Sequence, residues 1–141
     1  MSEVIYKQPR AYQGFRISAG DTNRLALIFD PLAESVPFIS CVEIFDVGGK
    51  TPPNVHRHAF ETFFVLKGEA RATCNDVTVE LKTGDSLLIP PQGMHLIENI
   101  GSGRLYLLTM MVPNEEFAEL IRGGTPAPLD EQDLAVLGGV R

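Results

Sequence analysis

The sequence has little positive charge, and this shortage excludes some classes of partner. There are 12 lysines and arginines against 18 aspartates and glutamates, which gives a formal net charge of −6 at pH 7 and a pI near 5.0. Binding to nucleic acid needs basic surface that neutralises phosphates, and docking on an anionic membrane needs it too. We therefore expect no nucleic-acid or membrane partner, while the charge balance leaves a small-molecule ligand open.

Long apolar runs and cysteines are also scarce. No apolar stretch approaches the roughly 20 residues that cross a bilayer as a helix. The first residues, MSEVIYKQPR, lack the apolar centre of a secretory signal. Cys41 and Cys74 lie far apart in the sequence, and we expect two reduced thiols rather than a disulfide. These features together predict a cytoplasmic protein.

The chain does contain a series of short β-type runs between turn residues. Its 141 residues suit a single domain. The runs are rich in branched and aromatic residues or alternate in polarity, and they cover 25–29, 36–46, 62–66, 77–81, 86–89 and 105–112. Short strands at this spacing predict an all-β fold, a sandwich or a barrel. Asn75-Asp76 predicts a two-residue hairpin between 69–74 and 77–81.

The chain changes character after residue 112. Asn114 is placed to cap a short helix over 115–122, and Asp130 to cap a second helix over 131–137 that ends at Gly138-Gly139. We expect the apolar sides of these helices to cover the body of this subunit or of a partner. The single domain then divides into an N-terminal strand or arm (1–35), a barrel core (36–112) and a C-terminal helical extension (113–141).

The chain has only three histidines, and two of them lie in the segment NVHRHAFETFFVLKGE, residues 54–69. Residues i and i+2 of a strand point to the same side, so His56 and His58 are predicted to project together. Two imidazoles and the nearby carboxylate of Glu61 suit a mixed nitrogen and oxygen metal site. A His-x-His pair also occurs by chance on solvated surface, and the pair alone leaves that alternative open.

The third histidine, His95, lies in GDSLLIPPQGMHLIEN, and the two segments together resemble the motifs of the cupin superfamily of small jelly-roll barrels. The first cupin motif has a glycine, His-x-His, a glutamate, six residues and a glycine, matched here by Gly49, His56, His58, Glu61 and Gly68. The second has a glycine, five residues, a proline, a histidine and an asparagine, matched here by Gly84, Pro90, His95 and Asn99. The resemblance covers roughly residues 36–112 and implies a jelly-roll β-barrel.

The resemblance also implies a divalent metal ion inside the barrel, held by His56, His58, Glu61 and His95. Only two residues separate His58 from Glu61, where the family has three or four, so either Glu61 reaches the metal or water takes its place. Fe, Mn, Ni and Zn all suit such ligands. A homodimer is implied as well, with residues 25–29 and the C-terminal helices as candidate contacts.

Three functions are compatible with such a site. The first is a metal-dependent dioxygenase of the non-haem iron type that acts on a small organic molecule, because an open coordination position is the mark of a catalytic metal. The second is a non-redox metal-dependent isomerase, lyase or decarboxylase, and the third is a cupin that binds a small ligand without catalysis. Candidate residues for the lining of a mostly apolar cavity, each with ordinary core packing as its alternative, are Phe63, Val65, Met94, Tyr106 and Met110.

Overall fold

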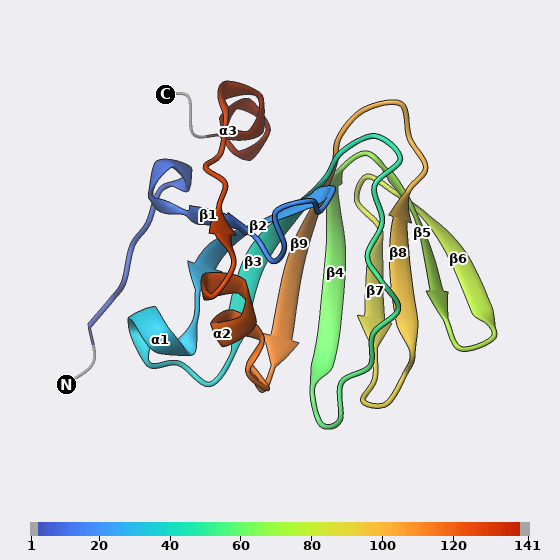
Figure 1. The fold of residues 1–141 in the computed structure, drawn as a ribbon, viewed down its shortest axis with the longest axis horizontal. Coiled ribbons are helices and arrows are strands. Elements are labelled where there is room, and N and C mark those ends of the chain that lie inside the picture. Colours follow the sequence, from blue (N-terminus) through green and yellow to red (C-terminus); the bar gives the residue numbers. More distant parts are fainter. Residues whose placement is uncertain (1–2, 139–141) are drawn as a thin grey trace.

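The computed structural model describes residues 3–138 and contains two antiparallel sheets (Figure 1). The larger sheet has seven strands in the order β10-β1-β2-β3-β9-β4-β7, and the smaller has three in the order β6-β5-β8. The strands are β1 (Gln13–Arg16), β2 (Asn23–Phe29), β3 (Ile39–Phe45), β4 (Phe60–Lys67), β5 (Glu69–Cys74), β6 (Val77–Lys82), β7 (Ser86–Ile89), β8 (His95–Asn99), β9 (Leu105–Val112) and β10 (Thr125–Pro126). The predicted all-β jelly-roll class is confirmed.

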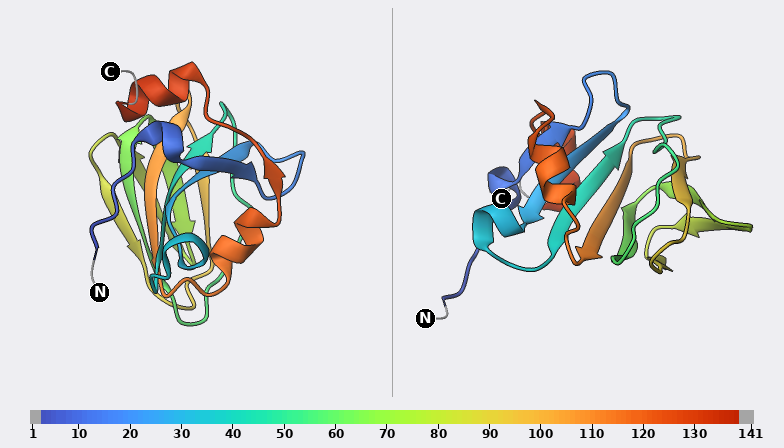
Figure 2. Two further views of the ribbon diagram at one scale, coloured as in Figure 1. Left: turned by 90° about the vertical axis from the view of Figure 1, so that its left-hand side faces the viewer. Right: turned by 60° about the horizontal axis from the view of Figure 1, so that its bottom comes forward.

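Short helices accompany the sheets, and the two in the C-terminal extension were predicted from the sequence, whereas the two near the N-terminus were not. They are the 3-10 helix η1 (Pro9–Ala11), α1 (Pro31–Glu34), α2 (Phe117–Arg122) and α3 (Glu131–Leu137). Figures 1 and 2 show that they gather at the β1–β3 end of the larger sheet, away from β5 and β6. None of the helices in residues 3–138 is long and apolar enough to cross a membrane.

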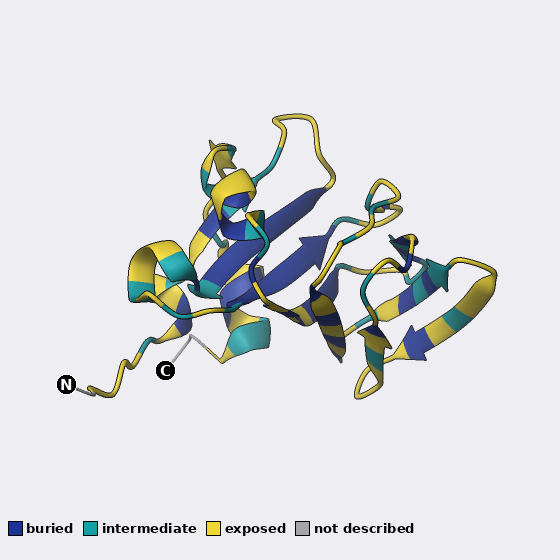
Figure 3. Ribbon diagram, turned by 90° about the horizontal axis from the view of Figure 1, so that it is seen from below, coloured by how far each residue is buried: buried dark blue, intermediate teal, exposed yellow. Residues whose placement is uncertain are grey.

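Alternation along the strands sorts the side chains of the larger sheet into an inward and an outward set. In β4, Glu61, Phe63 and Val65 are buried and face inward, while Thr62 and Phe64 are exposed on the other side. Both faces of β3 are covered, and Figure 3 shows the central strands of this sheet buried along most of their length. The two faces of the larger sheet are therefore covered differently, and the candidate site described below lies on the inward face.

Three apolar clusters hold these layers together. The first lies between the two sheets and includes Phe63 of β4 and Ile97 of β8. The second lies where α2 covers the inward face beyond the small sheet, and it includes Met111 and Ile121. The third joins α3 to the outward face around Tyr106. The small sheet and α2 thus cover neighbouring parts of one face, and α3 covers the opposite face.

The two C-terminal helices differ in how well their starts were predicted. Asp130 caps α3 through a capping box with Asp133, as expected, and Gly138 ends this helix at a φ of 77°; Gly139 lies outside the described residues. The expected start of α2 is wrong. Asn114 Oδ1 accepts a hydrogen bond from the Ala118 N–H, but residues 115 and 116 take left-handed φ values of 52° and 67°, so α2 begins at Phe117.

Candidate metal centre

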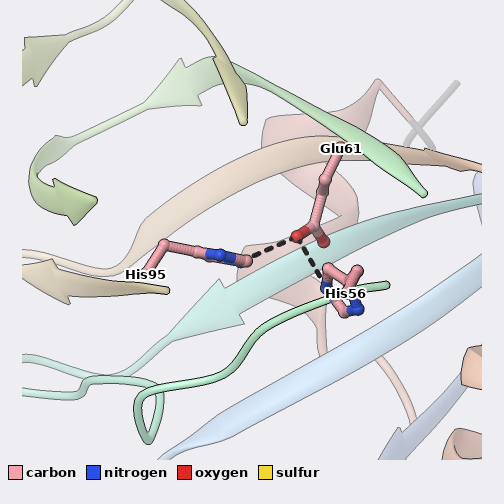
Figure 4. A group of neighbouring side chains, drawn as sticks. All are labelled: His56, Glu61 and His95. Atoms are coloured by element: carbon pink, nitrogen blue, oxygen red, sulfur yellow. Dashed lines mark hydrogen bonds and ion pairs between the residues drawn. The ribbon is translucent and has the colours of Figure 1, made fainter. Parts of the chain in front are cut away.

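Three side chains from separate elements meet inside the barrel (Figure 4). His56 comes from the segment between β3 and β4, Glu61 from β4, and His95 from the start of β8. Their ligand atoms all lie within 4.8 Å of one another. Glu61 Oε1 is 3.0 Å from His95 Nε2 and 3.2 Å from His56 Nε2. Two imidazoles and one carboxylate therefore converge on one point.

Strand pairing fixes two of these residues. Glu61 sits in the register between Met111 of β9 and Ile89 of β7, so its backbone is paired on both sides. His95 pairs with Cys74 of β5 and exchanges backbone hydrogen bonds of 2.9 Å with Asn54 on its other side. Both side chains are almost fully buried.

The hydrogen bonds of His95 determine which of its nitrogens faces Glu61 as a ligand atom. The Gly93 carbonyl can only accept, so His95 Nδ1 carries a proton and donates it over 2.8 Å. A neutral His95 then presents the Nε2 lone pair to the lone pairs of the Glu61 carboxylate. The contact is favourable only when a proton or a cation lies between them. A carbonyl on the second nitrogen is also the usual way in which a metal-binding histidine is oriented.

The directions of the pKa shifts of His95 and Glu61 favour a proton at this position in the metal-free protein. Burial alone lowers the pKa of His95, but its hydrogen bond with Glu61 and the one with Gly93 outweigh this, and the pKa is raised from its ordinary value. Burial acts to raise the pKa of Glu61, and hydrogen bonds with His56 and His95 outweigh it, so that pKa is lowered. The donor set therefore fits a divalent cation, which would replace the proton.

His56 is held in a different way. Its carbonyl accepts a 2.6 Å hydrogen bond from the Gln92 N–H. Glu115, which follows β9, binds the next two residues: Oε2 accepts from the Arg57 N–H at 2.9 Å, and Oε1 from the His58 N–H at 2.6 Å. Glu115 Oε2 also lies 3.9 Å from His56 Nδ1. A carboxylate in the C-terminal extension thus fixes the segment that carries a candidate ligand.

The structure does not bring His58 into the group. The expected strand at 56–58 is absent: Arg57 and His58 form a bend, and His58 is exposed. The prediction that His56 and His58 project together depended on that strand, because the i and i+2 rule holds only in extended chain. The short spacing left open whether Glu61 reaches the site, and in the structure Glu61 Oε1 lies between the half-buried imidazole of His56 and the buried imidazole of His95.

The predicted lining residues also separate into groups. Phe63 and Val65 face inward, and the Phe63 ring lies edge-on to His95 with the ring centroids 6.5 Å apart. Tyr106 and Met110 are on the outward face, where the Tyr106 hydroxyl donates to Asp133 and Met110 is 40% exposed, so they do not line the site. Met94 is 48% exposed. An off-by-one position in β9 is enough to place a side chain on the wrong face.

Sequence reasoning missed a buried carboxyl on the inward face, that of Glu43 in β3. Glu43 Oε1 accepts a 3.3 Å hydrogen bond from the Thr109 hydroxyl. Burial, followed by the negative charge of Glu61, raises the pKa of Glu43 to about 8. The signal was present, because Glu43 is the single charged residue in the strand ISCVEIF, which is otherwise apolar or small. A lone acid in a strand covered on both faces has to lie in the interior.

Comparisons with known proteins agree with this architecture. The family model described as "Cupin domain" matches residues 41–111. An uncharacterized protein of Methanocaldococcus jannaschii is 37% identical over 70 residues, which are 50% of this chain and 56% of that protein. The chain thus matches about half the length of this curated relative.

Two solved structures have a similar fold. The cupin domain of Schizosaccharomyces pombe Cnp3 superposes with a TM-score of 0.63 at 22% identity, covering 84% of this chain and 76% of that one. A Thermotoga maritima protein described as a predicted oxalate decarboxylase gives a TM-score of 0.69 at 21% identity, covering 77% and 99%. At these identities the likeness concerns the fold.

Proposed function

The chain belongs to the cupin family, and on this premise we propose that it is a metal-dependent enzyme of the non-haem iron dioxygenase type. The convergence of His56, Glu61 and His95 within 4.8 Å is the observation that carries the proposal. Two histidines and one carboxylate, with the remaining coordination positions open, are the ligand set of non-haem Fe(II) oxygenases. A ligand set without His58 matches these enzymes better than four protein ligands would.

Within the proposed site each residue has a definite task. A bound metal would supply a Lewis acid and a template that holds a small molecule beside O₂. Glu61 and His95 contribute ligand atoms from paired strands, and the Gly93 carbonyl keeps the Nε2 of His95 free to bind. Phe63 and Met111 provide apolar walls that exclude bulk water. These surroundings favour a small, largely apolar organic substrate.

Oxygen consumption tests this function. The protein is loaded with Fe(II) under anaerobic conditions and then mixed with O₂ and a panel of catechols, enols and 1,3-diketones. We expect substrate-dependent oxygen uptake that the His56→Ala variant lacks. Uptake that is equal in the variant would contradict the proposal.

The alternative functions follow from the fact that these ligands can bind several different metals. Mn, Ni and Zn also accept imidazole and carboxylate, which keeps a non-redox isomerase, lyase or decarboxylase as the second candidate. Turnover under strict exclusion of O₂ with one of these metals would favour it. A thermal shift caused by a small ligand, with no turnover under any condition, would favour a cupin that only binds.

We also propose that the protein is a cytoplasmic homodimer. Both cysteines are free, which suits a reducing compartment. Leu25 and Leu27 are buried in their own chain, but Ile28 and Phe29, at the end of the run 25–29, are partly exposed. These two residues line a hollow of about 850 Å³ on the outward face of the large sheet together with the exposed side chains of Phe64, Leu108 and Met110. Exposed apolar patches of this kind mark interaction surfaces.

Sedimentation analysis of the Phe64→Glu variant tests the dimer. The substitution places a charge on the outward face without touching the metal ligands, so we expect a dimeric wild type and a monomeric variant that still binds metal. A wild type that sediments as a monomer would contradict this proposal.

A further inference from the structure

A stripe of three polar side chains crosses the inward face of the large sheet. It runs diagonally from Glu43 in β3 through Thr109 in β9 to Glu61 in β4. Glu43 pairs in register with Leu107, two residues from Thr109, and Thr109 pairs with Phe63, two residues from Glu61. Diagonal neighbours of this kind are about 7–8 Å apart, within reach of one another's side chains. The stripe therefore ends at the metal ligands.

The stripe also separates two apolar clusters. On one side lie Phe63, Leu107 and the rest of the cluster between the two sheets. On the other lie Cys41, Met111 and the rest of the cluster under α2. Polar residues interrupt the packed interior along one line that leads away from the metal ligands, and such an interruption is costly unless the polar groups have partners.

One oxygen at the far end of the stripe has no such partner. Glu43 is 5% exposed, and within residues 3–138 its side chain has a single hydrogen bond, the one that Oε1 accepts from the Thr109 hydroxyl. Within residues 3–138, every fully buried side-chain nitrogen or oxygen has a hydrogen-bond partner. Glu43 Oε2, which has none, must therefore retain contact with space that water can enter. This oxygen is available to a ligand.

The interior around the stripe contains no lysine or arginine side chain in residues 3–138. Arg24 is the one fully buried lysine or arginine in the described part of the chain, and it pairs with Asp133 beside α3, on the outward face. The partly buried ones have partners elsewhere, as Arg104 does with Asp130 and Arg122 with Asp30. A second negative charge on a bound molecule would be buried near Glu61 with no lysine or arginine to offset it.

We propose that Glu43, oriented by the hydroxyl of Thr109, binds an uncharged hydroxyl or carbonyl group of the substrate, at the end opposite the group that faces the metal. The substrate class is then a short molecule with at most one anionic group, which binds at the metal, and a neutral polar group at its other end. Glu43 is in this assignment a substrate-binding residue and not a metal ligand. The inference rests on the proposed metal site.

Paired ligands of equal length test the assignment. The full chain is loaded with Co(II), whose visible absorption changes when a ligand binds at the metal. It is titrated with 3-hydroxypropanoate and malonate, with 4-hydroxybutanoate and succinate, and with 5-hydroxypentanoate and glutarate. At one chain length we expect the hydroxy acid to bind at least about tenfold more tightly than the diacid, since a tenfold ratio corresponds to about 1.4 kcal/mol.

Two variants of similar volume assign this binding to Glu43. Glu43→Met removes the polar atoms that bind the hydroxyl group, and the affinity for the hydroxy acid is expected to fall about tenfold. Glu43→Gln keeps a hydrogen-bonding group and is expected to retain that affinity, and both variants should bind Co(II) as tightly as the wild type. Equal affinity for both members of every pair, or a hydroxy-acid affinity that is unchanged in Glu43→Met, would overturn the inference while leaving the metal site standing. Failure of the wild type to bind Co(II) stoichiometrically would overturn the proposed function, and this inference with it.

Discussion

The two halves of the candidate metal site are held by different means. Glu61 and His95 belong to strands, and their backbones are fixed by pairing with β9, β7 and β5. His56 belongs to an irregular segment that is fixed by a carboxylate from the C-terminal extension and by single backbone bonds. The same three side chains thus converge through a regular ladder on one side and through local contacts on the other.

This difference decides where each half is vulnerable. Ladder bonds are numerous and cooperative, so a strand residue keeps its place when a single neighbour is changed. The His56 segment depends on few bonds, and two of them come from one side chain, that of Glu115. The loop half should therefore respond to substitutions that do not touch the metal ligands, whereas the strand half should not.

Replacement of the two motif histidines gives the largest expected effect. His56→Ala should lose stoichiometric metal, because it removes one of three ligands. His58→Ala should retain metal, because His58 is exposed and outside the group. Metal analysis after dialysis measures both, and circular dichroism checks that the variants are folded. Loss of metal in His58→Ala would mean that the loop rearranges to bring His58 to the metal.

The same division explains how much of the site could be predicted from the sequence. Alternation in TFFVL correctly placed Phe63 and Val65 on the inward side, because a paired strand obeys a period of two. Applied to HRH, the same rule failed, since the conformation there is set by Glu115, which lies 57 residues further along the chain than His58. Tyr106 and Met110 were misplaced because an uninterrupted apolar strand such as LYLLTMMV contains no alternation that identifies its inward face.

Protons should compete with the metal for His95, in the strand half, over a wider pH range than they would for an ordinary histidine. In the metal-free protein the pKa of His95 is raised, so its Nε2 holds a proton at higher pH than an ordinary histidine. A metal must displace this proton, and affinity should fall by about tenfold for each pH unit below that pKa. Isothermal titration with Co(II) from pH 8 to pH 5 measures the slope. An affinity that is constant over this range would rule out His95 as a ligand.

The carboxyl of Glu43, which is buried near the strand half, should lower the stability of the metal-free protein as the pH rises. The pKa of Glu43 is raised to about 8 by burial and by Glu61, whereas in the unfolded chain it is near 4.5. Between these values the folded state binds the extra proton, so the metal-free protein should lose about 1.4 kcal/mol of stability for each unit that the pH rises. Glu43→Gln should abolish this contribution. Its free energy of unfolding, relative to that of the wild type, should therefore increase by about 3 kcal/mol as the pH rises from 5.5 to 7.5.

Urea unfolding of the metal-free protein at several pH values measures this contribution. The control is Glu80→Gln, which removes an acid from the exposed side of β6 and should leave the pH dependence of the wild type intact. An equal slope in wild type and Glu43→Gln would show that the Glu43 carboxyl is not held protonated in the folded protein.

The loop half offers the sharpest contrast through two neighbouring glutamates. Glu115 and Glu116 both have left-handed backbones, but only Glu115 binds the N–H groups of Arg57 and His58. Glu115→Gln removes the charge that strengthens both bonds, and Glu116→Gln makes the same change on an exposed side chain. Outer partners of metal ligands typically contribute 10- to 100-fold in affinity. We expect Co(II) affinity to fall about tenfold in Glu115→Gln and to stay unchanged in Glu116→Gln.

Both variants should unfold at similar urea concentrations, because Glu115 lies on the surface segment that orients His56 and not in the apolar clusters. If both variants bind Co(II) alike, the bond from the Gln92 N–H to the His56 carbonyl and the pairing of Asn54 with His95 suffice to place His56, and the two halves of the site are equally robust.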